Sequence, residues 1–337
     1  MNQTVNILES THPRNLWGQT AYIRRQAQID PFRDRERFRP LNRAYTGDDT
    51  FWSIPSPEPD LENAFWEQVK ARLNEPAVQE AARRLAGRLL GWEPNPRKLL
   101  FAAVLRAGVP IADWLTRLLP GSAAVSMSLF VGPGIDRAAL QMARKDYPDR
   151  TLVFVDGWTG RGGVARTLRK LNAGPLAVLN DPWGWADFCG FRGDLFCPTA
   201  CFTGAATLGF SRTFIDTPGT VFAAYTFPRR YCRKDLVSAW QHHCPDPLAS
   251  SIFPGAGDRP APFFKKTDLR LHTNEVCRAL INADPKTLYF QVEAAEAQTR
   301  YPLLLALAER RRVKIVYGVR SLEEFRTQAA CALNFAR

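Results

Sequence analysis

The strongest constraint on the fold is the stretch from residue 151 to 164, which reads TLVFVDGWTGRGGV. An apolar strand ends in Asp156, a glycine-rich loop with one hydroxyl follows, and a helix begins at once. Glycines let backbone N–H groups approach a phosphate closely, and a helix N-terminus adds partial positive charge. We therefore expect an anion-binding turn in which Thr159 donates to a phosphate oxygen and Asp156 binds ribose hydroxyls or hydrated magnesium. The alternative is an ordinary strand–helix turn with Asp156 as a cap. The order of the glycines excludes both a Walker loop and a dinucleotide fingerprint.

Strands and helices alternate through the middle of the chain, after two helices expected between residues 60 and 90 with a break near 74–76. Strands separated by helices of about ten residues indicate a parallel sheet with crossover helices, whose ligands sit at the carboxyl ends of the strands. The expected strands are 98–104, 123–130, 151–155 and 176–179, and the expected helices are 110–119, 137–145 and 163–171.

Two further loops follow strands in the same way. In the first, Arg106 offers a planar donor to phosphate oxygens, and Gly108 leaves room for backbone contact. The alternative is a surface arginine in a plain turn. The second loop, residues 131–136, ends at Asp136. Its glycines fit either a mobile loop that closes over the substrate and excludes water or a simple turn.

The length of 337 residues suggests about two domains. Proline-rich or turn-rich clusters lie at residues 54–59 and 250–262, and a short α/β piece follows the second cluster. In that piece we expect helices at 273–280, 302–312 and 322–332 and strands at 287–292 and 313–317. The expected divisions are an Arg/Pro-rich segment 1–59, a sheet domain 60–250, a linker 251–263 and a small domain 264–337.

The composition is that of a globular protein, with 45% hydrophobic and 23% charged residues. No apolar run reaches the roughly 18 residues of a membrane helix, and the N-terminus lacks the pattern of a secretory signal. Seven scattered cysteines favour reduced thiols over a disulfide framework, so we expect a cytoplasmic protein with no membrane contact. The net charge of +12 attracts phosphate, either on a metabolite or on RNA.

The three loops together, LRAGVPIA, GIDRAAL and FVDGWTGRGGV, resemble those of the type I phosphoribosyltransferases. More narrowly, residues 60–235 resemble the StiP family of bacterial tellurium-resistance and stress operons. The resemblance implies an α/β fold with a phosphoribosyltransferase-like parallel-sheet domain. It also implies a reaction in which a nucleophile displaces pyrophosphate from phosphoribosyl pyrophosphate, with Mg²⁺ as the cofactor. Two departures are Gly157, where the family usually carries a second acidic residue, and residues 131–133, which lack arginine and aspartate.

The resemblance also assigns roles to residues. It places Asp156 on the ribose and on substrate-bound magnesium, and Arg106 with Gly108 on the pyrophosphate. The remaining substrate-binding residues it implies are Thr159, Gly160, Arg161, Gly162, Gly163 and Asp136.

Residues 264–337 resemble the small α/β Pelota-type RNA-binding module that often follows StiP domains, which implies RNA as a second partner. Two basic runs, 229–234 and 309–312, fit either RNA contact or solvated surface. A non-catalytic nucleotide- or RNA-binding stress protein is therefore a further alternative.

The StiP family also carries the label of a cysteine protease, which directs attention to Cys201. A peptidase needs a thiolate with a histidine within hydrogen-bond reach, and His242 and His243 are the available candidates. The alternative for Cys201 is a buried apolar thiol. A zinc site is a further hypothesis, although only the spacing Cys197-x3-Cys201 supports it. Its potential ligands are Cys189, Cys197, Cys201, Cys232, His242, His243 and Cys244.

Overall fold

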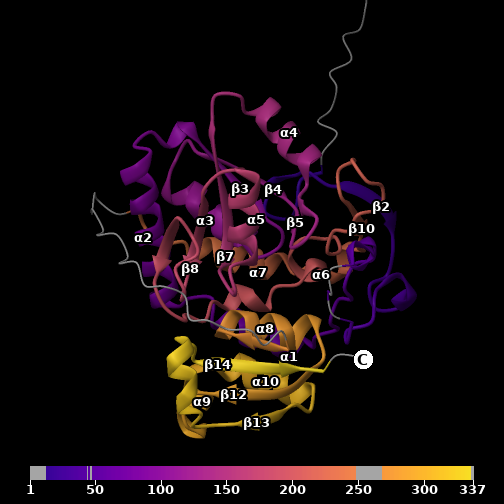
Figure 1. The fold of residues 1–337 in the computed structure, drawn as a ribbon, viewed down its shortest axis with the longest axis vertical. Helices are drawn as coiled ribbons and strands as arrows, with labels where there is room; N and C mark the ends of the chain where they lie inside the picture. The colour runs from indigo at the N-terminus through magenta and orange to yellow at the C-terminus, as the bar shows by residue number, and fades with distance from the viewer. Residues whose placement is uncertain (1–12, 44, 46–47, 248–267, 335–337) are drawn as a thin grey trace, which may run out of the picture.

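The structure, a computed structural model, describes residues 13–43, 45, 48–247 and 268–334. Its centre is a six-stranded sheet in the order β1-β4-β3-β7-β8-β9, in which every neighbouring pair is parallel (Figure 1). The parallel α/β sheet expected from the sequence is thus present. The strands are β1 (Thr20–Ala21), β4 (Ala123–Met127), β3 (Leu99–Val104), β7 (Thr151–Trp158), β8 (Leu176–Asn180) and β9 (Phe188–Phe191).

The central strands are apolar because helices cover both faces of the sheet. Every residue of β3 and of β8 is buried. One face packs against α2 (Pro76–Trp92), α3 (Gly108–Leu118) and α7 (Lys234–His242), where Trp114 and Trp240 stack at 3.7 Å between ring centroids. The other face packs against α4 (Arg137–Asp146) and α5 (Gly163–Leu171). The predicted pair of helices before the sheet is α1 (Asn63–Ala71) and α2.

The chain changes direction across the sheet between β3 and β7. From β3 it passes through α3 to β4 on one side, and from β7 it passes through α5 to β8 on the other side. Ligands of open α/β sheets bind outside the carboxyl ends of the strands at such a switch point. Arg106 lies in the loop that follows β3 at this point, and Asp156 lies near the end of β7.

Several small elements border the sheet. Strand β2 (Arg24–Gln28) pairs in parallel with β10 (Ala223–Thr226), so the N-terminal segment is part of the fold. The predicted strand 123–130 is divided at Ser128 into β4 and β5 (Leu129–Phe130), which forms a hairpin with β6 (Gly134–Ile135). The shorter helical segments are α6 (Gly204–Thr207) and the 3₁₀ turns Arg35–Arg37, Asp49–Ser53, Pro96–Lys98, Pro198–Cys201, Arg229–Tyr231 and Arg320–Phe325. In the part of the chain that is described, no helix has the length and apolarity to cross a membrane.

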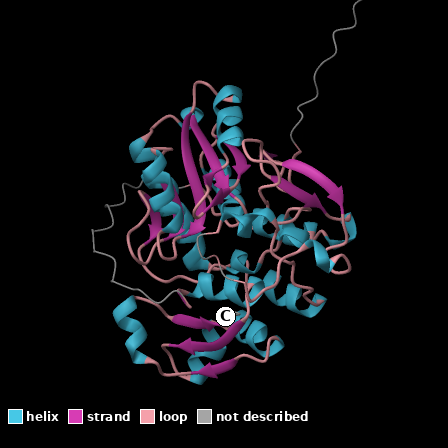
Figure 2. Ribbon diagram, turned by 45° about the vertical axis from the view of Figure 1, so that its right-hand side comes forward, coloured by secondary structure: helices cyan, strands magenta, loops and turns pink. Residues whose placement is uncertain are grey.

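The C-terminal part contains a second, mixed sheet with the order β11-β14-β12-β13. Figure 2 draws its strands in magenta at the lower end of the molecule. Only β12 and β13 are parallel, while β14 runs antiparallel to β11 and β12. The strands are β11 (Leu269–Leu271), β12 (Pro285–Phe290), β13 (Lys314–Val316) and β14 (Ala329–Leu333), and the helices are α8 (Thr273–Asn282), α9 (Ala294–Arg300) and α10 (Pro302–Arg310).

The predicted helix at 322–332 is wrong. The chain makes a 3₁₀ turn, takes a left-handed conformation at Arg326 with φ of 52°, and enters β14. The alanine-rich sequence of β14 has helical propensity, but its place between two partner strands overrides that propensity.

Helix α8 lies between the two sheets and joins them (Figure 1). Asp194, in the loop after β9, accepts from the backbone N–H of Thr273 at 2.9 Å and of Gln328 at 2.7 Å. Trp183 Nε1 donates to the carbonyl of Phe325 at 2.8 Å. One apolar core runs through both parts. The predicted linker at 251–263 lies outside the described residues, so the domain boundaries stay predictions.

Candidate functional site

Arg106 leaves the carboxyl end of β3 and enters a buried ion pair. Its guanidinium donates to Glu58 Oε1 at 3.1 Å and to Asn282 Oδ1, on α8, at 2.9 Å. The two side chains of the ion pair are 8% and 1% exposed. Arg106 is thus held by a carboxylate and by the last turn of α8, and is not extended toward solvent.

Asp156, near the end of β7, has an unusual ionisation. Its Oδ1 accepts from the N–H of Gly157 at 2.7 Å. Burial, helped by the charge of Glu275, raises the pKa of Asp156 to about 7, although the Gly157 N–H and Arg278 act in the opposite direction. This carboxyl group therefore changes its protonation state near neutral pH.

Two more arginines are close enough to interact electrostatically with the charged side chains named above, and one of them, Arg278 on α8, donates to the carbonyls of Ala200 and Phe202 at 3.2 and 2.7 Å. Burial and the charges of Arg39 and Arg106 lower the pKa of Arg212 to about 9. Burial, Arg106 and Arg212 lower the pKa of Arg278 to about 9. We call this group the strand-end cluster; its members are Glu58, Arg106, Asp156, Arg212, Glu275 and Arg278.

The strand-end cluster, together with Arg39 beside it, carries more cationic than anionic groups. Four arginines face three carboxyl groups, one of which, Asp156, is partly protonated at neutral pH. Buried charges are costly unless they are paired, so such an excess favours the binding of an anion. The arrangement can hold a phosphate or carboxylate group at the switch point of the sheet.

The glycine-rich loop is covered by side chains from three directions. A Cβ on Gly160 would lie 2.9 Å from Glu275, one on Gly162 would lie 2.3 Å from the Trp185 ring, and one on Gly163 would lie 2.9 Å from Val131. Gly162, the N-cap residue of α5, has φ of 76°, a left-handed conformation that favours glycine.

The polar side chains of this loop also have protein partners. Thr159 donates its hydroxyl to Asp181, and Trp158 Nε1 donates to Glu275 Oε1 at 2.8 Å. Arg161 is half-buried, and its pKa is lowered by burial and by Arg270 and Arg166. The Thr159 hydroxyl and the Trp158 indole N–H are therefore engaged by carboxylates of the protein.

Gly108 and Asp136 serve the packing of helices in this structure. A Cβ on Gly108 would lie 2.0 Å from the carbonyl oxygen of Val155, so glycine is what lets α3 approach β7. Asp136 is fully buried and caps α4 by accepting from the N–H of Ala139 at 3.0 Å, while its other oxygen accepts from the N–H of Phe222 at 2.6 Å. The structure brings Arg106 and Asp156 together and leaves Asp136 in a capping position.

Cys201 ends the 3₁₀ turn Pro198–Cys201 and lies against α8. Its Sγ is fully buried, 3.5 Å from the Sγ of Cys277. Burial raises the pKa of the Cys201 thiol well above its usual value, and the neighbouring Cys277 thiol raises it further. Among the described residues, no contact joins a histidine to this thiol; His242 and His243 lie at the end of α7 and contact each other.

A family model described as "Tellurite-like stress resistance cysteine protease StiP" matches residues 30–240, which is more than half of the chain. The chain belongs to the StiP family. The "Cysteine protease StiP" of Acinetobacter baylyi is 30% identical over 146 residues, which cover 38% of this chain and 38% of that protein. The chain thus matches well under half the length of this relative. No solved structure matches.

This membership confirms the StiP resemblance drawn from the sequence and agrees with the protease label, while the phosphoribosyltransferase resemblance of the three loops stays a prediction. The match ends before α8, so the structure adds what the family model does not cover. In this StiP-family chain, α8 supplies Glu275, Arg278 and Asn282 to the site and Cys277 to the contact with Cys201.

The described residues contain no group of three His, Cys, Asp or Glu side chains placed to hold a metal ion. The cysteines of the zinc hypothesis are free thiols, and most are buried. At the strand-end cluster the two neighbouring carboxyl groups are Asp156 and Glu275. Mg²⁺ is commonly held by one or two carboxylates together with substrate phosphates, and this pair fits that pattern.

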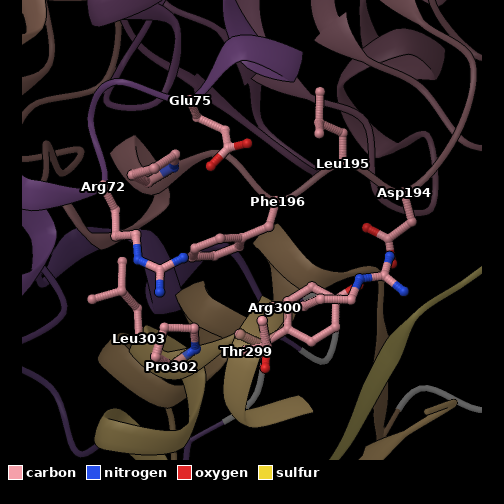
Figure 3. A pocket seen from close by; sticks show the side chains of 11 residues that line it. Arg72, Glu75, Asp194, Leu195, Phe196, Thr299, Arg300, Pro302 and Leu303 are labelled. Atoms are coloured by element: carbon pink, nitrogen blue, oxygen red, sulfur yellow. The ribbon is translucent and has the colours of Figure 1, made fainter. Parts of the chain in front are cut away.

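A separate cavity of about 350 Å³ lies where the loop after β9 meets α9 and α10 (Figure 3). Arg72 and Glu75 stand on one side, and Asp194 and Arg300 on the other, with the Phe196 ring between them. No member of the strand-end cluster lines this cavity.

The basic runs are largely engaged within the protein. Arg310 donates to Glu62 at 3.0 Å, and Arg311 donates to the carbonyls of Leu280 and Ile281. In the earlier run, Arg230 pairs with Asp30 at 2.6 Å.

Sequence reasoning missed four residues of the site: Glu58, Arg212, Glu275 and Arg278. None follows an expected strand of the main sheet. The only signal was that Glu58 is the single acid within a rigid proline run, Pro55-Ser-Pro-Glu-Pro59.

Proposed function

We propose that this chain binds a phosphate-bearing, nucleotide-like metabolite of the phosphoribosyl pyrophosphate class at the strand-end cluster, and that it acts as a phosphoribosyltransferase-like enzyme in stress resistance. The observation that carries the proposal is the excess of arginines at the switch point between β3 and β7. The stress context is supported by the family description.

In this proposal the cationic and acidic groups have different tasks. Arg212 and Arg278 bind the anionic leaving group, and Asp156 accepts from the ribose hydroxyls. Arg106 positions α8 through Asn282 and does not need to touch the ligand. Mg²⁺ held by Asp156 and Glu275 with the phosphates supplies further neutralisation of charge.

The reaction breaks the bond between C1 of the ribose and the pyrophosphate oxygen, and pyrophosphate leaves with the electron pair. An incoming nucleophile forms the new bond at C1. Because positive charge develops on the ribose and negative charge on the leaving group, the protein contributes by positioning and by electrostatic stabilisation.

Titration calorimetry of the intact chain with phosphoribosyl pyrophosphate and Mg²⁺ tests the proposal. We expect Arg278→Met to weaken binding by about tenfold or more, because a charged hydrogen bond is lost. Asp156→Asn should remove the dependence on Mg²⁺. Arg33→Met, which removes an exposed arginine elsewhere, is the matched control. No binding by the unaltered chain, or equal binding by Arg278→Met, would refute the proposal.

A second candidate is a cysteine peptidase that uses Cys201, and the names of the family and of its Acinetobacter baylyi member support a peptidase more directly than a transferase. In this structure α8 covers the thiol, so peptidase action requires α8 to move away from the Pro198–Cys201 turn. Peptide hydrolysis that survives Cys201→Ala and thiol alkylation would eliminate this candidate, whereas loss of hydrolysis only in Cys201→Ala, and not in Cys331→Ala, would support it.

A further inference from the structure

The cavity of about 350 Å³ shown in Figure 3 plays no part in the proposed function, because no member of the strand-end cluster lines it. Its walls come from three places: the segment between α1 and α2, the loop after β9, and the junction of α9 with α10. Sites for small molecules measure roughly 300–1,000 Å³, so a small metabolite fits inside it.

The charged side chains that line the cavity are equal in number for each sign. Two are cationic, Arg72 and Arg300, and two are anionic, Glu75 and Asp194. A ligand with a single charge would be attracted by one pair and repelled by the other at similar range. A ligand that carries one charge of each sign matches this lining better.

Two of the four charged side chains are already engaged by the protein. Asp194 accepts from two backbone N–H groups of the C-terminal part, and Arg300 donates to Glu296 on its own helix at 2.7 Å. Within the described part of the chain, the side chains of Arg72 and Glu75 make no hydrogen bond and no ion pair, either with each other or with another residue. One guanidinium and one carboxylate on the same side of the cavity therefore remain for a ligand.

Tyr301 adds a hydroxyl group that also lacks a partner. The residue lines the cavity, although only 3% of its surface is exposed, and its ring stacks on Phe290 at 5.6 Å between centroids. Buried tyrosine hydroxyls usually find a hydrogen-bond partner, but among the described residues this hydroxyl has none. Burial raises the pKa of Tyr301, so the hydroxyl stays protonated and can donate to a ligand oxygen.

The remaining large side chains of the cavity are apolar. They belong to Leu195, Phe196, Pro198, Pro302 and Leu303. Figure 3 shows the Phe196 ring between the side with Arg72 and the side with Arg300. The cavity thus offers apolar contact area next to its two unpaired charges, and apolar surface on a ligand is favourably buried there.

We propose that this cavity binds a free α-amino acid with an apolar side chain. Arg72 and the Tyr301 hydroxyl bind the carboxylate, Glu75 binds the ammonium group, and the ligand's side chain packs against Phe196. A residue at the end of a peptide keeps only one of these two neighbouring charges, so the free amino acid is the better match. This binding site is separate from the strand-end cluster, and what it binds does not depend on the proposed function.

Titration calorimetry of the intact chain with L-leucine and L-phenylalanine tests this proposal. Leucinamide, which has no carboxylate, and N-acetyl-leucine, which has no ammonium group, are the matched ligands. We expect a Kd for leucine on the order of 1 mM or lower, and binding of each analogue at least about tenfold weaker. The proposal is wrong if neither amino acid binds, or if both analogues bind as tightly as leucine.

Two variants locate the binding in this cavity. Glu75→Gln should abolish the preference for leucine over N-acetyl-leucine, and Arg72→Met should abolish the preference for leucine over leucinamide. Glu36→Gln and Arg33→Met change exposed residues outside the cavity, and both preferences should survive in these controls. Leucine binding with both preferences intact in Glu75→Gln and Arg72→Met would overturn the assignment of the site.

Tyr301→Phe keeps the test independent of folding. The variant retains the buried ring and loses a hydroxyl that has no hydrogen-bond partner among the described residues, so its unfolding temperature should not fall. We expect leucine to bind this variant about threefold more weakly or worse. Unchanged leucine affinity in Tyr301→Phe would contradict the role given to the hydroxyl in the site.

Discussion

The Asp156 carboxyl group makes the stability of the folded protein depend on pH. This group lies among charged side chains near the carboxyl end of β7, where burial raises its pKa from 3.8 to about 7. In the unfolded chain the same group ionises near its ordinary value. Between about pH 4 and 7, Asp156 is therefore protonated in the folded state and ionised in the unfolded state. Its contribution to the free energy of unfolding is fully present below pH 4 and is lost as the pH rises to 7.

Asp156→Asn should consequently stabilise the protein without ligand, and more so at high pH. We expect its gain in the free energy of unfolding to be about 1–3 kcal/mol larger at pH 8 than at pH 5. Urea unfolding of both proteins at the two pH values measures this difference. The same gain at both values would mean that the Asp156 pKa is not raised.

At the scale of elements, the apolar runs of β3, β7 and β8 and the helices between them could be predicted, because their patterns are local. The pairing of β14 could not be predicted, because its alanines have helical propensity and only the pairing with β11 and β12 makes this segment a strand. Half of the candidate site was equally hidden: α8 was predicted as a helix, but nothing in its sequence shows that Glu275 and Arg278 face Asp156, because that depends on docking across about 120 residues.

The contact between α3 and β7 gives a prediction at this scale. Gly108→Ala places a Cβ against the Val155 carbonyl, and we expect it to destabilise the protein by about 2 kcal/mol or more. The matched control is Gly91→Ala in α2, where nothing lies within 4 Å of the new Cβ, and which should be neutral or stabilising. Thermal unfolding compares the two, and equal effects would contradict the close approach.

At the scale of the whole molecule, the C-terminal part supplies Glu275 and Arg278, on α8, to the strand-end cluster. Asp194 is central to this docking, because it accepts from Thr273 and from Gln328. If α8 holds Arg278 in place, loosening the docking must weaken the site as well as the C-terminal part.

Asp194→Asn removes one acceptor oxygen and should lower the protection of amides in residues 269–334 from hydrogen exchange, with a loss of about 1–3 kcal/mol. Pyrophosphate affinity should fall in parallel. The control is Asp187→Asn, because the Asp187 carboxylate accepts from the N–H of Leu176 in the parallel sheet. This variant should leave the C-terminal amides protected from exchange. Unchanged exchange in Asp194→Asn would show that the docking does not depend on this residue.

The central claim is that the arginines of the strand-end cluster hold an anion at the junction of the two sheets. A crystal structure of the intact chain grown with pyrophosphate and Mg²⁺ tests it most directly. The account predicts phosphate oxygens within hydrogen-bond distance of Arg278 and Arg212, with α8 in its present place. Pyrophosphate bound only at the Thr159–Gly163 turn, or nowhere near the cluster, would contradict it.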